Sequence, residues 1–238
     1  MKAVILAGGQ GARLSPHTKI LPKPLLPLGE MPILEIILLQ MKRAGIKDIV
    51  LTVGYLSKII SSYFGNGEQF GVEIVYSHED IPLGTSGPLS LINGLDETFL
   101  VSNGDVLCDM DLRKLIEGHK QSGAIATIAM YNQEVNINLG VIKLNGRNQV
   151  VGYSEKPSYT YPVSMGIYIF EPKVLDYISH NKYFDFPDLV LKLIENDEVV
   201  MAYPFDGYWR DLGNAEIMRK LCKIFKPGES SFYLRKNN

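Results

Sequence analysis

The first dozen residues constrain the fold most, because an apolar run leads directly into a glycine-rich loop. Residues 2–7 (KAVILA) are apolar after the lysine, which predicts a short strand buried on both faces of a sheet. Gly8, Gly9 and Gly11 follow within four positions. Glycine gives up more chain entropy on folding than any other residue, so this cluster needs a reason. The turn either requires positive φ angles or lets backbone amides approach a phosphate closely.

Strand-like and helix-like segments alternate as far as residue 122. Apolar runs typical of buried strands occupy residues 48–53, 72–77 and 98–105. Segments typical of helices occupy residues 31–46, 56–64 and 111–122. A further short helix is expected over residues 86–94, with Pro88 in its first turn. This alternation indicates βαβ units, which build a mostly parallel sheet.

The pattern changes after residue 122, where strand-like segments follow one another with few helices between them. These segments cover residues 124–131, 139–145, 150–156 and 163–170. Asn145-Gly146 is a strong hairpin signal. The remaining expected elements are helices near 172–179 and 187–195, a strand at 198–203 and a last helix from Ala215. We therefore expect one α/β domain with a Rossmann-like open mixed β-sheet flanked by helices, and no left-handed β-helix.

Charge and cysteine content exclude several classes of function. The formal net charge of −2 gives no electrostatic reason to bind nucleic acid or an anionic membrane. Only Cys108 and Cys222 are present, so no disulfide framework is indicated and a reducing compartment suits the chain. The N-terminal residues lack the apolar core of a signal peptide, and no apolar stretch is long enough to span a bilayer. We expect a soluble, cytoplasmic protein.

A lysine framed by prolines favours the phosphate-binding interpretation of the glycine loop. Pro22 and Pro24 fix the backbone on either side of Lys23 and bias it toward an extended form. A stiffly held amine, together with Arg13, suits a polyphosphate clamp beside the first strand. Neither the P-loop nor the dinucleotide-binding fingerprint fits, because the loop lacks the Gly-Lys-Ser/Thr of the first and the last glycine of the second.

Residues 6–35, LAGGQGARLSPHTKILPKPLLPLGEMPILE, resemble the opening signature of sugar-phosphate nucleotidylyltransferases, G-G-x-G-x-R-L-x-P-x-T-x-x-x-P-K-P. The family's later landmarks follow in order as EDIPLGTSG, VSNGD, LGVI, SEKP, MGIYIF, YFDFPDL and YWRDLG. The resemblance covers about residues 1–220 and is strongest to the mannose-1-phosphate guanylyltransferase-like branch. It implies the nucleotide-diphospho-sugar transferase fold.

The resemblance implies attack by a sugar 1-phosphate oxygen on the α-phosphorus of a nucleoside triphosphate, with release of pyrophosphate. A phosphate monoester with a second pKa of about 6 is already largely dianionic at neutral pH, so no general base is needed. The protein should supply cations and positioning, and the implied catalytic residues are Arg13 and Lys23.

Two aspartates match the family's magnesium ligands. Asp105 directly follows the strand-like stretch FLVSNG, which places it at the carboxyl edge of the sheet, and Asp211 stands in YWRDLG. Mg²⁺ prefers oxygen ligands, usually one or two carboxylates completed by phosphate oxygens and water. As alternatives, Asp105 caps a turn or helix, or Asp109 and Asp111 form the D-x-D metal site of a glycosyltransferase. Asp111 also fits the N-cap of the following helix.

The stretch EDIPLGTSG is the candidate base-reading loop. Its glycines would let the chain pass close to a flat ring, and Thr85 or Ser86 would donate hydrogen bonds. Glu79 or Asp80 would accept from guanine N1–H and the 2-amino group, or both acids are simply solvated. This favours GTP weakly, with UTP or CTP as the alternative. The implied nucleotide-binding residues are Leu6, Ala7, Gly8, Gly9, Gly11, Arg13, Lys23, Glu79, Gly84, Thr85, Asn103 and Gly104.

The stretches SEKP and VSMGIYIF are the implied sugar side of the site. By resemblance, Glu155 holds sugar hydroxyls and Lys156 holds the sugar phosphate. Ser164 stands where the family usually has asparagine, which offers both a donor and an acceptor on a longer side chain. The sugar therefore need not be mannose. The implied sugar-phosphate-binding residues are Asp105, Gly140, Glu155, Lys156, Ser164 and Gly166.

On this interpretation the single domain, residues 1–238, has three parts. They are a nucleotide-binding half (1–122), a sugar-phosphate-binding half (123–213) and a C-terminal helix and tail (214–238). The expected substrates are a nucleoside triphosphate and a sugar 1-phosphate, and the expected cofactor is Mg²⁺. A homodimer is a candidate assembly. We expect no nucleic acid or membrane as a partner. The competing hypotheses are a glycosyltransferase and a non-catalytic sugar-nucleotide sensor.

Overall fold

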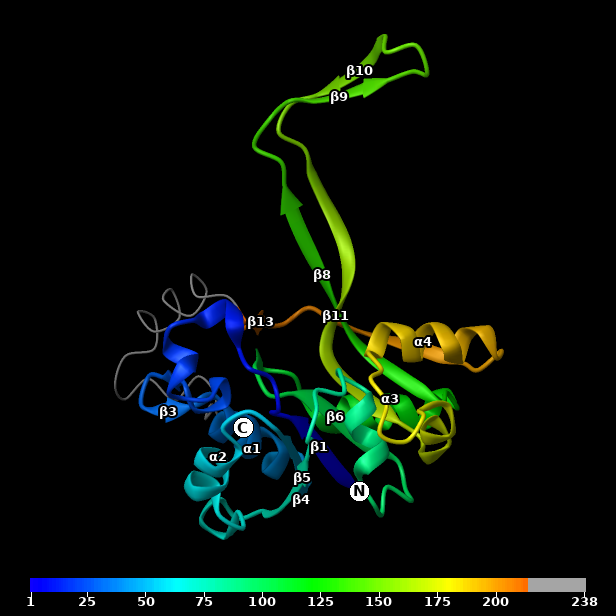
Figure 1. The fold of residues 1–238 in the computed structure, drawn as a ribbon. Helices are drawn as coiled ribbons and strands as arrows, with labels where there is room; N and C mark the ends of the chain where they lie inside the picture. Colours follow the sequence, from blue (N-terminus) through cyan, green and yellow to red (C-terminus); the bar gives the residue numbers. More distant parts are fainter. Residues whose placement is uncertain (214–238) are drawn as a thin grey trace, which may run out of the picture.

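A seven-stranded mixed sheet forms the centre of the computed structural model, which describes residues 1–213 (Figure 1). In spatial order its strands are β12 (Val200–Phe205), β8 (Ala126–Asn136), β11 (Ser158–Phe170), β6 (Phe99–Asn103), β1 (Lys2–Leu6), β4 (Asp48–Val53) and β5 (Glu73–His78). β1 is parallel to both of its neighbours, whereas β11 is antiparallel to β6 and β8. The predicted open mixed sheet is confirmed. The helix predicted from Ala215 lies outside the described residues.

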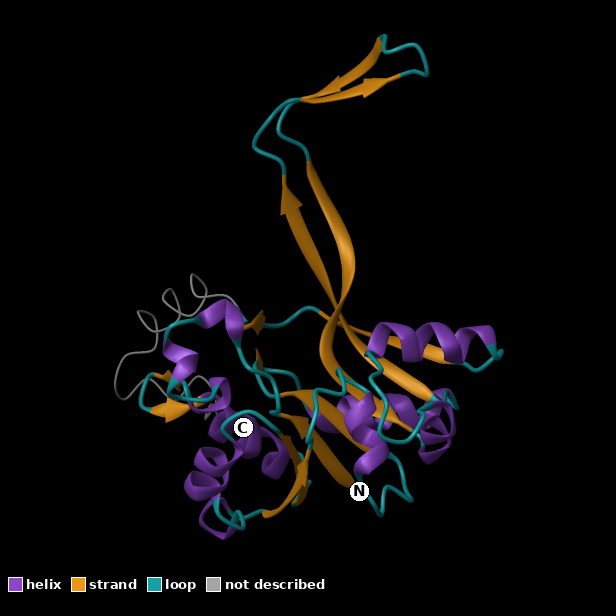
Figure 2. Ribbon diagram, in the orientation of Figure 1, coloured by secondary structure: helices purple, strands orange, loops and turns teal. Residues whose placement is uncertain are grey.

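Helices cover both faces of this sheet (Figure 2). They are α1 (Ile33–Arg43), α2 (Ser57–Phe64), α3 (Leu112–Ser122) and α4 (Phe186–Glu195). Ala3 and Ile5 of β1 belong to the apolar cluster that also contains residues of α1, α2 and α3. Val4 points to the opposite face and joins the cluster that contains residues of α4. β1 is therefore buried on both faces, as its unbroken apolar sequence predicts.

Two expected helices are short 3₁₀ segments instead. Gly87–Leu91 and Pro172–Tyr177 each carry a proline in the first turn and are too short to propagate an α-helix. The other 3₁₀ turns are Ala12–Leu14, His17–Lys19, Lys23–Leu25 and Glu68–Phe70. The body also contains two small antiparallel pairs: β2 (Pro27–Leu28) with β3 (Met31–Pro32), and β7 (Val106–Cys108) with β13 (Trp209–Asp211).

A long two-stranded arm projects from the sheet (Figure 1). β8 and β11 stay paired from Met130↔Ser164 out to Asn136↔Ser158. At the far end, β9 (Val141–Leu144) and β10 (Val150–Ser154) form a hairpin. We call residues 130–164 the arm. Its base lies where the register between β8 and β11 shifts, next to Gly166, whose φ is 75°.

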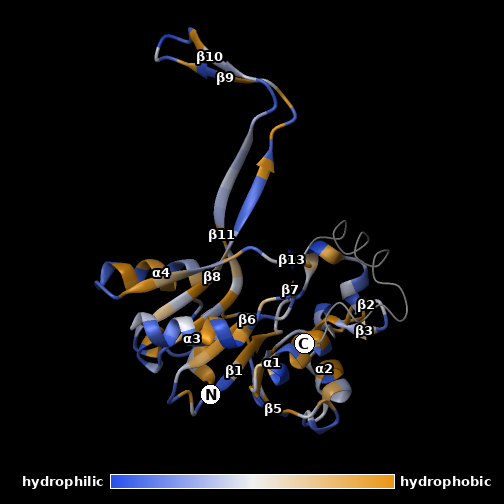
Figure 3. Ribbon diagram, turned by 180° about the vertical axis from the view of Figure 1, so that it is seen from behind, coloured by the Kyte–Doolittle hydropathy of each residue, from blue (hydrophilic) through white to orange (hydrophobic). Residues whose placement is uncertain are grey.

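The predicted hairpin at the tip is confirmed, but it turns by another mechanism. The chain reverses over residues 145–149, with positive φ at Asn148 and not at the Asn145-Gly146 pair. The Asn145 side-chain oxygen accepts from the amides of Arg147 and Gln149, so Asn145 forms an Asx turn. Apolar residues of the body lie on its strands and also on helices such as α4, and a further apolar stretch marks β10 (Figure 3). No helix within residues 1–213 is long and apolar enough to cross a membrane.

Candidate active site

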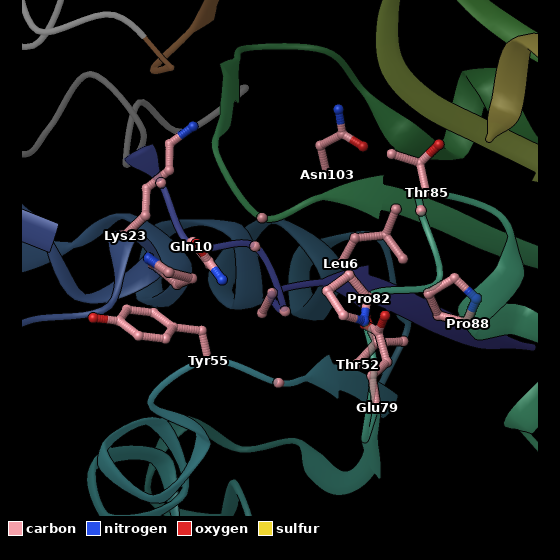
Figure 4. A pocket seen from close by; sticks show the side chains of 18 of the residues that line it. Leu6, Gln10, Lys23, Thr52, Tyr55, Glu79, Pro82, Thr85, Pro88 and Asn103 are labelled. Carbon is pink, nitrogen blue, oxygen red and sulfur yellow. The ribbon is translucent and has the colours of Figure 1, made fainter. Parts of the chain in front are cut away.

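A cleft of about 710 Å³ opens near the carboxyl ends of β1, β4 and β6 (Figure 4). Leu6, Thr52 and Asn103 contribute to its lining from these three strands. β1 lies between two parallel neighbours, and open α/β sheets bind ligands outside the carboxyl ends of such strands. Every residue of the predicted nucleotide-binding set lines this cleft, from Leu6 to Gly104. The structure thus brings the whole set together at one edge of the sheet.

The three glycines of the loop after β1 differ in their surroundings, since a side chain would be crowded at Gly8 and Gly11 but not at Gly9. Gly11 has a φ of 61°, and a Cβ there would lie 2.9 Å from Cγ2 of Thr18. A Cβ on Gly8 would lie 2.5 Å from Oε1 of Glu79. A Cβ on Gly9 would meet nothing within 4 Å, so the backbone there stays open toward the cleft. The loop therefore combines a left-handed turn with a bare backbone stretch that a ligand can approach.

The lysine between the two prolines is held against the first predicted metal ligand. Lys23 is only 9% exposed, and its Nζ contacts the Asp105 carboxylate. Pro22 enters the Lys23–Leu25 turn in extended backbone, with φ −63° and ψ 143°. An ammonium group is costly to bury without a partner, so the contact with Asp105 offsets that cost and fixes the amine at the cleft.

The second predicted metal ligand lies on the neighbouring segment. β13 pairs with β7 so that Asp211 stands opposite Val106, the residue after Asp105. The Leu212 amide donates to the Asp105 carbonyl at 2.9 Å, and the Gly213 amide donates to the Asp211 carboxylate at 2.6 Å. Two aspartates far apart in the sequence are thereby placed on adjacent stretches of chain.

Arg13 completes a cluster of four charged residues. A Cβ on Gly213 would lie 2.9 Å from both Nη2 of Arg13 and Oδ1 of Asp211, so these two side chains flank Gly213. Arg13, Lys23 and Asp105 also line the cleft. No group of three or more His, Cys, Asp or Glu side chains suited to a metal occurs within residues 1–213. The two carboxylates nevertheless fit Mg²⁺, which completes its shell with phosphate oxygens and water.

The candidate base loop is held by a segment about a hundred residues away. Oδ1 of Asp185 accepts from both the amide and the hydroxyl of Thr85, at 2.9 and 3.0 Å. The Ser86 hydroxyl donates to the Phe184 carbonyl at 3.0 Å. Both hydroxyl protons considered for base recognition are therefore used within the protein. The loop can therefore contact a ligand in the cleft only through its surface shape and through groups other than these two hydroxyl protons.

Asp185 is a residue of this region that the sequence analysis did not assign. An aspartate just before a proline-containing helix start is the usual N-cap signal, yet Asp185 makes no capping hydrogen bond to α4. Burial would raise the pKa of Asp185, but hydrogen bonds from the Tyr183 hydroxyl and from Thr85 outweigh it and hold the pKa below its usual range. The aspartate is an acceptor for the base loop.

Glu79 is the carboxylate that faces the glycine loop. It is half-buried and accepts from the Leu83 amide at 3.1 Å. Burial raises the pKa of Glu79, and the hydrogen bond from Leu83 opposes that rise only in part. Its neighbour Asp80 is exposed, although both line the cleft. Glu79 is thus the better placed of the two for a fixed hydrogen bond to a base.

The predicted sugar-phosphate residues fall into two groups. Gly166 lies against Asn103 of the cleft, since a Cβ there would lie 2.5 Å from Nδ2 of Asn103. The Ser164 hydroxyl donates to the Tyr168 hydroxyl at 3.0 Å at the base of the arm. Gly140, Glu155 and Lys156 lie on the arm, and none of them lines the cleft. The structure does not bring these three residues to the nucleotide side within one chain.

The Asp109-Met110-Asp111 pair has structural partners. Asp111 caps α3 by accepting from the Arg113 amide at 3.1 Å, as the sequence predicts. Asp109 is exposed and accepts from the Tyr208 amide at 2.8 Å. Neither lines the cleft.

Comparison with known proteins agrees with this geometry. A UTP–glucose-1-phosphate uridylyltransferase from Synechocystis is 36% identical, with 90% of this chain and 60% of that protein covered. A mannose-1-phosphate guanylyltransferase from Mycobacterium tuberculosis is 33% identical, with 90% and 61% covered. The chain spans about 60% of the length of these curated relatives.

Solved structures match over nearly their whole length. A putative glucose-1-phosphate thymidylyltransferase from Bacillus anthracis gives a TM-score of 0.75 at 26% identity, with 95% of each chain covered. HddC from Yersinia pseudotuberculosis in complex with GMP-PN gives a TM-score of 0.71 at 27% identity, covering 94% of this chain and 99% of that one. The family described as "Nucleotidyl transferase" matches residues 2–224. With that match, and with the glycine loop and charged cluster at the ends of β1 and β6, the chain belongs to the nucleotidyl transferase family.

Proposed function

We propose that the chain is a Mg²⁺-dependent sugar-1-phosphate nucleotidylyltransferase that makes a nucleoside diphosphate sugar and pyrophosphate. The observation that carries this proposal is that Arg13, Lys23 and Asp105 line one glycine-rich cleft, with Asp211 on the strand that pairs beside Asp105. In this assignment residues 1–122 bind the nucleotide and residues 123–213 bind the sugar phosphate.

The reaction brings two anions together, so charge and positioning dominate its barrier. The bare backbone at Gly9 approaches the triphosphate, and the amine of Lys23 and guanidinium of Arg13 balance the charge that grows on the departing pyrophosphate. Asp105 and Asp211 would hold Mg²⁺, which supplies Lewis-acid stabilisation of phosphate oxygens. The sugar phosphate attacks as a dianion, because its second pKa is about 6.

For the base we propose guanine, so GTP is the expected nucleotide. Glu79 is a half-buried acceptor held in place by the Leu83 amide, and guanine offers N1–H and the 2-amino group side by side. The solved HddC structure with GMP-PN supports a guanine nucleotide in a relative of this fold. Uridylyl- and thymidylyl-type relatives make UTP and dTTP the competing nucleotides.

The direct test is a matrix of nucleotides and sugars. GTP, UTP, CTP and dTTP are each mixed with mannose, glucose, glucosamine or heptose 1-phosphate, and pyrophosphate release is followed with Mg²⁺ and with excess EDTA. We expect release with GTP and at least one sugar phosphate, and its loss in EDTA. A protein that releases pyrophosphate from none of the pairs would contradict the proposal.

Asp185 should act on nucleotide binding through the base loop. Asp185→Ala removes the acceptor for the Thr85 amide and hydroxyl, so the loop loses its anchor. We expect the KM for the nucleotide to rise about tenfold, the equivalent of one hydrogen bond to a charged group, with a smaller change in kcat. Asp188→Ala, at an exposed position in the first turn of α4, is the control. Steady-state kinetics at saturating sugar phosphate measures both, and equal KM values in the two variants would refute the role.

A further inference from the structure

The arm places the predicted sugar-phosphate residues far from the cleft of their own chain. From Met130↔Ser164 to Asn136↔Ser158 the ribbon contains seven paired residues in each strand, which span about 20 Å of extended strand. Glu155 and Lys156 come just beyond that ribbon, after β10 (Figure 1). The ladder is unbroken over this length, so bending the arm back within the ribbon would cost hydrogen bonds of the ladder.

The hairpin at the tip has one apolar face that nothing in residues 1–213 covers. Ile142 stands opposite Tyr153, and Leu144 opposite Val150. Residues directly opposite in an antiparallel pair share a face, and so do residues two apart, so these four side chains form one surface. Each of them is between 50% and 65% exposed. Because a lone two-stranded hairpin is marginally stable in water, this surface calls for a partner.

Two polar residues beside this apolar face are set up for a ligand. The Tyr153 hydroxyl donates to the Glu155 carboxylate at 3.1 Å, which orients the acid. Lys156 has a φ of 46°, a conformation that non-glycine residues seldom adopt, and its side chain has no hydrogen-bond or ion-pair partner within residues 1–213. A positioned acid and an unpaired cation thus stand at the root of an uncovered hairpin.

The rim of the cleft offers a matching surface. Ile81, between two cleft-lining residues, and Tyr183, which lines the cleft, are both largely exposed. Exposed apolar side chains at the mouth of the cleft can pack against the apolar face of the hairpin. A second copy of the chain brings both surfaces at once, and a twofold axis makes the exchange reciprocal.

We propose that two copies of the chain exchange arms, so that Glu155 and Lys156 of one copy complete the sugar-phosphate side of the other copy's cleft. The apolar face of Ile142, Leu144, Val150 and Tyr153 then packs on the partner's rim. This inference rests on the proposed function, because it assigns these polar residues to the sugar phosphate.

The assembly is tested without any turnover. Light scattering after gel filtration should give the full chain the mass of a dimer. Ile142→Glu should shift it to a monomer, whereas Lys143→Glu, the next residue on the opposite face, should stay dimeric. A monomeric wild-type chain, or a dimer that Ile142→Glu leaves intact, would overturn the exchange. This readout stands even if no pyrophosphate is released, so it separates the failure of the exchange from the failure of the proposed function.

Delivery of the arm to the partner's cleft is tested by complementation. Lys23→Met and Lys156→Ala chains carry different tags, are produced together, and the mixed dimers are isolated through both tags. Each variant alone should be strongly impaired at low sugar phosphate. In the mixed dimer one cleft keeps Lys23 and receives an intact arm, so about half the wild-type rate should return. An impaired mixed dimer beside an active wild-type enzyme would mean that each arm serves its own cleft, and would overturn the proposal.

Discussion

Asp105→Asn should lower kcat/KM for nucleotidyl transfer roughly 1,000-fold, the upper end of the range for losing one preorganised electrostatic group. The substitution removes charge from one of the two carboxylates that would hold Mg²⁺ and deprives Lys23 of its charged partner. The loss is measured as the rate of pyrophosphate release. Higher Mg²⁺ should restore part of it, because a weakened site is filled again by mass action.

Asp111→Asn is the matched control for this variant. Asparagine caps helices about as well as aspartate, so α3 should keep its start and the activity should stay within about twofold. A glycosyltransferase using the Asp109 and Asp111 pair predicts the reverse order of damage. Equal activity of Asp105→Asn and the wild-type chain would refute the metal assignment.

Lys23→Met should lower kcat/KM about 100- to 1,000-fold, because it removes a fixed positive charge from the part of the cleft where we propose that the triphosphate binds. Methionine keeps an unbranched apolar stem of similar length, so the packing of the nearly buried side chain changes little. The Asp105 carboxylate is left without its amine but still lines the cleft, where water and Mg²⁺ reach it. Pyrophosphate release and the melting temperature are measured together.

Lys19→Met provides the comparison on the same loop. Lys19 is exposed and touches the neighbouring structure through its backbone carbonyl, which the Tyr55 hydroxyl contacts and which the substitution retains. We expect its activity to stay near that of the wild-type chain. A similar loss in both variants would show that general charge around the loop, and not the position of Lys23, governs the rate.

The first half of the molecule follows from local patterns in the sequence. β1 could be predicted because a strand buried on both faces must be apolar throughout, and the glycine loop because Gly11 needs a positive φ. Contacts between segments that are distant in the sequence could not be predicted from these local patterns. The hydrogen bond from the Thr85 amide to the Asp185 carboxylate joins residues a hundred positions apart. The local pattern around Asp185 indicates only the start of a helix.

The direction in which the arm leaves the sheet could not be predicted from the sequence either. The Asn145-Gly146 pair between two strand-like segments predicts a hairpin, and the turn at Asn145 fixes its register. The angle at which the ribbon leaves the sheet depends on the register shift beside Gly166 and on its contact with Asn103, which no local rule specifies. The roles of Gly140, Glu155 and Lys156 therefore remain predictions that depend on what the arm meets.

The contact between Lys23 and Asp105 has a consequence for the order of binding. Before any ligand arrives, the Lys23 amine already contacts and balances the charge of the Asp105 carboxylate, one of the two proposed metal ligands. A free cation would have to compete with this tethered amine for the Asp105 carboxylate, whereas a magnesium–triphosphate complex would bring anionic oxygens that offer the amine another partner. Ion and nucleotide are thus expected to enter together, with the sugar phosphate following.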